Sequence, residues 1–121
     1  MRLICIIKKS ISMCSYKTWF HDDSIGYTVQ CEDCQNLQIG FGNVMLTLSF
    51  TAFSGFREMV NQEMEAIDPT RVNTSKCIIL STPCSSINLL LSTMELIALQ
   101  TMLETADNEM KADHLLSLFE K

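Results

Sequence analysis

Residues 27–49, YTVQCEDCQNLQIGFGNVMLTLS, decide the fold of this chain. Apolar and polar side chains alternate through residues 27–31, 37–41 and 44–48, which is the spacing of strands with one buried face. Polar turns containing glycine or asparagine separate the three runs, and both residues tolerate the backbone angles of tight turns. The stretch therefore predicts a three-stranded antiparallel meander.

A helix is expected directly after the meander, over residues 50–67. Ser49 is suited to cap its first turn, because a serine hydroxyl accepts a hydrogen bond from a free backbone N–H. Apolar residues then recur at spacings of three and four, as on one face of an amphipathic helix. We assign the aromatic members of this stripe to the core: Phe50, Phe53 and Phe56.

The second half of the chain repeats this pattern loosely. Shifting the sequence by 43 positions lays Ser49 on Ser92 and matches apolar positions on both sides of the serines. Self-similarity at a fixed shift is typical of a duplicated structural unit. We therefore predict two related strand–strand–helix units, at about residues 27–67 and 77–106.

The second unit would contain strands at residues 77–80 and 87–91, followed by a helix that begins after Ser92. Ser92 and Glu95 have the spacing of a capping box, in which each side chain bonds the backbone N–H of the other residue. A last amphipathic segment, residues 110–119, would form a C-terminal helix, either separate from the preceding helix or joined to it by a bend.

These elements predict a single α+β domain, an antiparallel sheet with helices on one face. A chain of 121 residues, 47% hydrophobic and 19% charged, can bury the core of one such domain. The two units would share a sheet or pack helix against helix. Residues 13–121 form the domain, and residues 1–12 are expected to be a loosely attached extension because they lack sustained periodicity.

The charge and the apolar runs limit the class of function. A formal charge of −5 disfavours binding to nucleic acids, because phosphates repel an acidic surface. No apolar run is long enough to span a membrane, and the first residues do not form a signal peptide. We therefore expect a cytoplasmic protein whose six cysteines are mostly reduced.

The motif with chemical potential is Cys31-Glu-Asp-Cys34. Two cysteines at this spacing in a turn can hold two corners of a tetrahedral zinc site. A structural site needs four ligands, and no second C-x-x-C is present. Cys14 and Cys84 are the best candidates for the remaining two, because each stands beside polar or turn residues. The zinc hypothesis therefore names Cys31, Cys34, Cys14 and Cys84.

Two other interpretations of the same cysteines remain open. A C-x-x-C pair could form a reversible disulfide, which would make the protein a thiol redox protein. The position between two strands and the neighbours Glu32 and Asp33 argue against this, because negative charge raises a thiol pKa. In the third interpretation the cysteines are reduced and serve only packing.

No motif of a known catalytic class is present in the sequence, neither a phosphate-binding glycine loop nor H-E-x-x-H. We expect a small binding or regulatory module rather than an enzyme. An acidic run at helical spacing, Glu104, Asp107, Glu109 and Asp113, is either a solvated face or a docking face for a basic partner. The apolar stripes of two helices exceed what one small domain covers, so a symmetric homodimer is also expected.

The chain from residue 13 to residue 119 resembles an uncharacterised family of Bacteroidota proteins with a domain of unknown function. The resemblance is carried by GYTVQCEDC at residues 26–34, QIGFGN at 38–43, STPC at 81–84 and LETADNEMKAD at 103–113. That family has no established activity. The resemblance implies a small cytoplasmic bacterial protein whose domain begins near residue 13.

Overall fold

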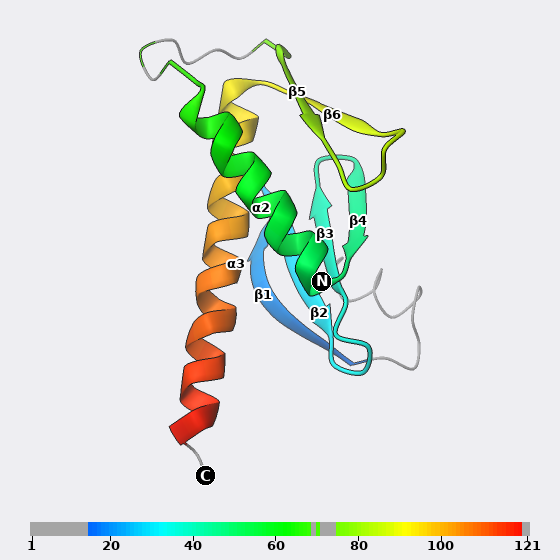
Figure 1. Cartoon of the computed structure of the whole chain (residues 1–121), viewed down its shortest axis with the longest axis vertical. Helices are drawn as coiled ribbons and strands as arrows, with labels where there is room; N and C mark the ends of the chain where they lie inside the picture. Colours follow the sequence, from blue (N-terminus) through cyan, green and yellow to red (C-terminus); the bar gives the residue numbers. More distant parts are fainter. Residues whose placement is uncertain (1–14, 69, 71–74, 120–121) are drawn as a thin grey trace.

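The chain folds into a four-stranded antiparallel sheet, a separate two-stranded hairpin and two helices, which confirms the α+β class (Figure 1). The computed structural model describes residues 15–68, 70 and 75–119, so the predicted extension at residues 1–12 lies outside the described part. The elements follow in the order β1 (Tyr16–Asp22), β2 (Gly26–Cys31), β3 (Leu37–Phe41), β4 (Val44–Leu48), α2 (Phe50–Glu65), β5 (Ile78–Ser81), β6 (Asn88–Leu91) and α3 (Thr93–Phe119).

The predicted meander is confirmed as β2, β3 and β4, which are neighbours in the sheet. Residues paired across antiparallel strands point to the same face of the sheet, so Leu37, Ile39 and Leu48 share the face that packs on the core. Val29 is paired with Gln38 and is therefore buried on the opposite face, and all four of these side chains are at most 6% exposed. The meander therefore supplies one wall of the core.

Strand β1, which the sequence did not predict, pairs antiparallel with β2 and completes the four-stranded sheet. Its register shifts between Thr18 and Phe20. A bulge of this kind breaks the two-residue period, and Trp19 and Phe20 are accordingly both half-buried. The irregular register explains why no strand pattern was recognised here.

Both helices begin at the predicted serine caps. The hydroxyl of Ser49 accepts a hydrogen bond from the backbone N–H of Ala52 at 3.1 Å. At the start of α3, the N–H of Glu95 donates to Ser92 Oγ at 3.2 Å, and the N–H of Ser92 donates to Glu95 Oε1 at 2.9 Å. The capping box is therefore confirmed.

The expected C-terminal helix is the continuation of α3, which runs unbroken over 27 residues. The residues expected to mark a bend, Asp107 and Asn108, lie inside this helix. Asp107 is 4% exposed, and its carboxylate pairs with Lys111 one turn later. This ion pair neutralises the acidic side chain, so the helix passes through the position without a break.

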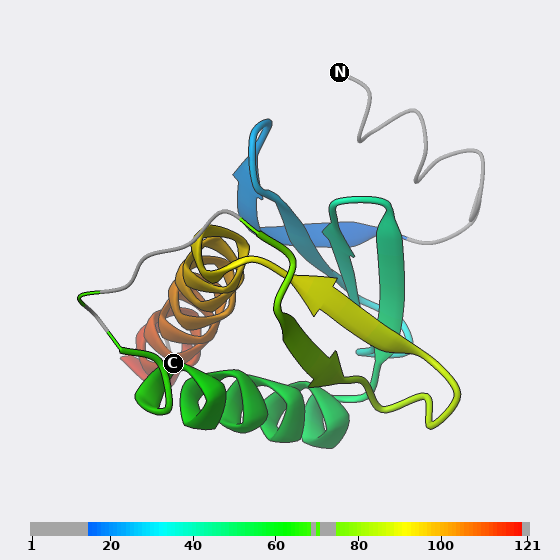
Figure 2. The same ribbon diagram turned by 90° about the horizontal axis from the view of Figure 1, so that it is seen from above.

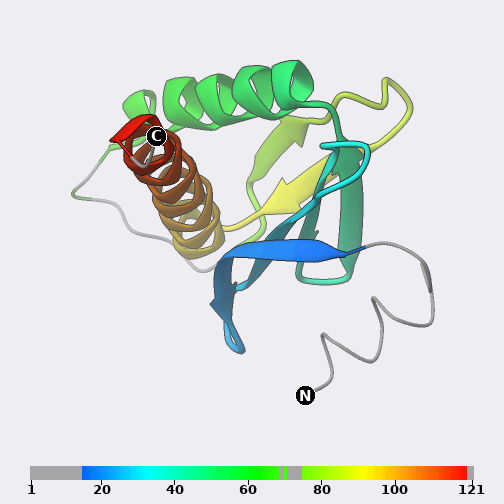
Figure 3. The ribbon, with the colours of Figure 1, turned by 90° about the horizontal axis from the view of Figure 1, so that it is seen from below.

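The two expected units do not share one sheet, because β5 and β6 form a hairpin of their own. They do pack helix against helix, and α3 also crosses β1 and β2 (Figures 2 and 3). The core lies between these layers and includes Phe53, Phe56, Leu99 and Leu103. None of the helices in the described part of the chain is long and apolar enough to cross a membrane.

Candidate functional site

The Cys31–Cys34 turn joins β2 to β3 and has a defined hydrogen-bond pattern. The backbone N–H of Cys34 points at Cys31 Sγ, 3.5 Å away. Gln35 has a φ of 66° and donates its N–H to the carbonyl oxygen of Cys31 at 2.9 Å. Cys31 is buried, whereas Cys34 is exposed.

The other cysteines lie elsewhere in the fold. Cys84 is exposed in the turn between β5 and β6, and Cys77 is exposed directly before β5. Cys14 falls outside the described residues. Within the described ranges no group of three or more His, Cys, Asp or Glu side chains could hold a metal ion. The structure therefore does not bring Cys84 to the Cys31–Cys34 pair.

The Cys84 thiol has a local environment of its own. Its Sγ lies 3.5 Å from the hydroxyl of Ser86. Hydrogen bonds from the Ser86 side chain, and then from the Ser86 backbone, lower the pKa of this thiol below its ordinary value. The side chain is an exposed thiol that is more readily ionised than an ordinary cysteine.

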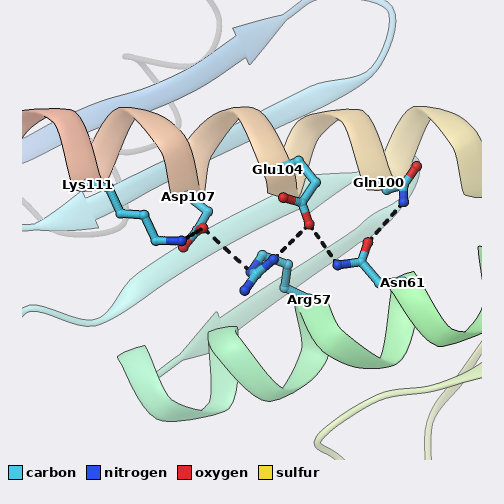
Figure 4. A network of polar contacts seen from close by, with 6 residues as sticks. All are labelled: Arg57, Asn61, Gln100, Glu104, Asp107 and Lys111. Carbon is cyan, nitrogen blue, oxygen red and sulfur yellow. Dashed lines mark hydrogen bonds and ion pairs between the residues drawn. The ribbon is translucent and has the colours of Figure 1, made fainter.

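A polar network joins α2 to α3 (Figure 4). Glu104 Oε1 accepts hydrogen bonds from Arg57 Nη1 at 2.8 Å and from Asn61 Nδ2 at 2.7 Å. Gln100 Nε2 in turn donates to Asn61 Oδ1 at 2.9 Å. The bond from Asn61 and the pairing with Arg57 lower the pKa of Glu104, and the bond to Glu104 raises the pKa of Arg57. The network fixes the two helices against each other.

Asp107 continues this network towards the end of α3. Its Oδ2 lies 2.8 Å from Lys111 Nζ and 3.8 Å from Arg57 Nε. Two members of the predicted acidic run, Glu104 and Asp107, are thus paired with cations of the same chain. A purely solvated acidic face is therefore wrong for this part of α3.

A groove begins where the network ends. It has a volume of about 620 Å³ and lies among β1, β2, the first residue of α2 and the last turns of α3. We call it the Trp19 groove, and its lining residues are Trp19, Gln30, Phe50, Asp107, Met110, Lys111, Asp113, His114, Leu115 and Ser117. Figure 1 shows that α3 extends beyond the start of α2, which leaves this side of α3 open.

The indole of Trp19 forms a fixed wall of the groove. Trp19 Nε1 donates to Gln30 Oε1 at 3.0 Å, and Lys17 Nζ lies 4.8 Å from the ring centroid. Lys17 also pairs with Asp113 of α3 at 2.8 Å. A cation over an indole face and a bonded indole N–H both hold the ring in place. The groove therefore has a preformed aromatic wall.

Sequence reasoning did not find this groove. Phe53 and Phe56 are buried as expected, but Phe50 is 54% exposed and lines the groove. Phe50 is the first helical residue, so it precedes the part of α2 that packs on the core. The available signal was the apolar content of residues 115–119, which continues after the core stripe of α3 has ended.

Comparison with known proteins places the chain in a family. The model of DUF6686, a family of unknown function, matches residues 13–120. No curated protein and no solved structure matches the chain. Since the match covers most of the sequence, the chain belongs to the DUF6686 family, and the expected resemblance to a family of unknown function is confirmed.

Proposed function

We propose that this member of the DUF6686 family is a small non-enzymatic binding module that holds an apolar segment of another protein in the Trp19 groove. The observation that carries the proposal is an open groove with apolar walls, Trp19, Phe50, Met110 and Leu115. Grooves that bind ligands are mostly apolar and contain a few placed polar groups. Aromatic side chains are also enriched where proteins bind one another.

The polar side chains of the groove support binding rather than chemistry. Asp113 is paired with Lys17, and Asp107 is paired with Lys111. Ion pairs that are fixed in this way can orient a ligand through hydrogen bonds. The apolar walls are left for contact. The cytoplasmic location expected from the sequence suits such a module and stays a prediction.

The groove can be tested with the dye 8-anilinonaphthalene-1-sulfonate, an apolar anion whose fluorescence rises on apolar surfaces. Trp19 is the single tryptophan of the chain, so energy transfer from Trp19 reports dye bound beside it. We expect Phe50→Glu to weaken this transfer about tenfold, since it places in the apolar wall a negative charge that repels the anionic dye.

Met45→Glu is the matched control, because Met45 is 52% exposed on β4 and does not line the groove. It should leave the dye signal unchanged. Equal loss in both variants, or loss in neither, would contradict binding in the groove. A photoreactive residue at position 50 should then form a discrete protein adduct in the native host, and one at position 45 should not.

A structural zinc ion is the second candidate, with Cys31 and Cys34 as ligands and Cys14 and Cys84 as the further pair proposed from the sequence. It is supported by the turn that directs the Cys34 N–H at Cys31 Sγ. The pair fits two corners of a tetrahedral site, but the described residues do not place Cys84 beside it.

Metal analysis of untagged protein tests the zinc candidate. About one zinc per chain, lost in Cys31→Ser and kept in Cys77→Ser, is the expected result. Metal-free protein with a reversible disulfide between Cys31 and Cys34 would favour the thiol redox alternative instead. Protein with neither zinc nor a reversible disulfide would indicate that these cysteines serve only packing.

We also propose that the domain contains two related hairpin–helix units. The shift of 43 positions carries Arg57 to Gln100 and Asn61 to Glu104. The Arg57–Glu104 contact therefore corresponds to the Gln100–Asn61 contact, as in a two-fold interface. The double variant Arg57→Gln, Glu104→Asn would make the two contacts alike, and we expect it to fold. An unfolded double variant would contradict the proposed relationship between the two hairpin–helix units.

A further inference from the structure

One line of residues along the outer face of α3 carries no charge over the whole length of the helix. Eight positions at alternating spacings of four and three form what we call the outer seam: Met94, Ala98, Thr101, Thr105, Asn108, Ala112, Leu115 and Phe119. Each is exposed or half-buried, and the charged residues of α3 all lie outside the seam. Solvent faces of helices are usually charged or polar. An uncharged seam with large apolar residues at its ends indicates a contact surface.

The seam lies opposite the core-facing side of α3. At 3.6 residues per turn, Leu115 is turned by about 180° from Ala106, which is fully buried. In Figure 1, α3 runs along one edge of the molecule, with the sheet and α2 to one side of it. The same helix therefore packs on the core with one face and leaves the opposite face open.

We propose that α3 pairs through this seam with α3 of a second copy of the chain, antiparallel and about a two-fold axis. Spacings of four and three are those of helices that pack side by side. The seam is complementary to itself when Thr105 lies opposite Asn108 of the partner subunit. This register sets Ala98 opposite Leu115 of the partner subunit, so a small side chain meets a large one. It also joins the two ends of the seam, Met94 and Phe119.

The side chains that flank the seam support the same arrangement. Ile97, Glu104, Lys111 and Leu118 follow one another at seven-residue spacing along one flank. In an antiparallel pair each flank meets the same flank of the other copy. Glu104 then lies near Lys111 of the partner subunit, and Ile97 lies near Leu118 of the partner subunit. Opposite charges and apolar side chains are thus matched across the axis.

The length of α3 suits a specific interface. Its 27 residues extend for about 40 Å, and a standard interface buries roughly 800 Å² per partner. The ends of the seam are the most open, since Met94 is 52% exposed and Phe119 is 84% exposed. Pairing covers both ends at once. Leu115 belongs both to the seam and to the lining of the Trp19 groove, so a dimer and a ligand in the groove would share this side chain.

Sedimentation of the full chain at a series of concentrations tests the dimer. We expect the mass of a dimer for the wild type and of a monomer for Thr101→Glu, which puts two charges into the middle of the paired seams. Thr51→Glu is the matched control, because Thr51 is an exposed threonine on α2, and it should remain dimeric. Ala112→Glu repeats the test at a second seam position, and circular dichroism checks that each variant is folded.

A wild type that is monomeric up to several hundred micromolar would overturn the proposal. A dimer that Thr101→Glu and Ala112→Glu leave intact would overturn it as well, because another surface would then hold the copies together. The groove is tested independently, since Phe50→Glu changes dye binding and should not change the sedimenting mass.

The antiparallel register has a test of its own. Met94 and Phe119 are separated by about 38 Å along one helix and should act independently within a chain. In the proposed dimer they touch across the axis. We expect Met94→Ala and Phe119→Ala each to raise the dimer Kd about tenfold, and the double variant to raise it no further than either alone. A double variant whose dimer Kd rises by the product of the two single effects would overturn this register.

Discussion

The two halves of α3 have similar apolar side chains and opposite surroundings. Residues 93–107 include seven buried residues, and five of these are apolar and at most 1% exposed. Residues 111–119 are all exposed, although they include three leucines and a phenylalanine. The helix is the same, but α2 accompanies only its first half, and α3 extends beyond the start of α2 (Figure 1).

This difference separates folding from binding along one helix. Apolar side chains in the first half stabilise the domain because they leave water when it folds. Those in the second half gain this free energy only when another molecule covers them. Monomeric proteins seldom expose so many neighbouring apolar residues. The last turns of α3 are therefore where we locate both the groove and one end of the dimer seam.

The largest expected effect on stability comes from the buried first half of α3. Leu103 is fully buried, and Leu103→Ala should lower the free energy of unfolding by about 2–5 kcal/mol, through lost burial and the cavity that remains. Leu116→Ala is the matched change in the second half, because the Leu116 side chain is 63% exposed. It should change the free energy of unfolding by less than about 0.5 kcal/mol in dilute protein. Urea unfolding measures both, and equal effects would contradict the division of α3.

A smaller effect concerns the network that ends the first half. Because the pKa of Glu104 is lowered from its ordinary value of 4.5, its contribution to stability is present above that value and is lost as the pH falls through the lowered pKa. The Glu104 side chain is 35% exposed, so Glu104→Gln should cost only about 1 kcal/mol at neutral pH.

Urea midpoints of the wild type and Glu104→Gln, measured from neutral pH into the acid range, check this expectation. The difference between the two proteins should shrink below pH 4.5. A difference that stays constant with pH would show that the charge of Glu104 does not stabilise the helix pair.

Much of the fold could be predicted because local patterns agree with the tertiary structure. The alternation in β2 to β4 and the serine caps of both helices needed no knowledge of distant contacts. Strand β1 was missed because the bulge near Trp19 breaks its alternation. Both strands of the β5–β6 hairpin were predicted, but whether they join the main sheet was left open, because local patterns do not determine how distant strands pair.

The candidate site could be predicted only in part. The Cys31–Cys34 turn was recognised because its spacing is local, whereas the position of Cys84 depends on how two hairpins are arranged. The Trp19 groove is formed where β1, α2 and α3 meet, so no single segment contains it. Phe50 shows why sequence alone did not predict the groove. It has the spacing of the core stripe of α2 in the sequence, but in the structure it lies outside the core.

Hydrogen exchange along α3, measured in dilute and in concentrated protein, tests the division of this helix most directly. Amides of residues 96–107 should be protected in both samples, because these residues belong to the folded core. Amides of residues 108–119 should exchange rapidly in dilute protein and slowly in concentrated protein, and in Thr101→Glu the slowing should disappear. Equal protection of both halves at every concentration would contradict the account.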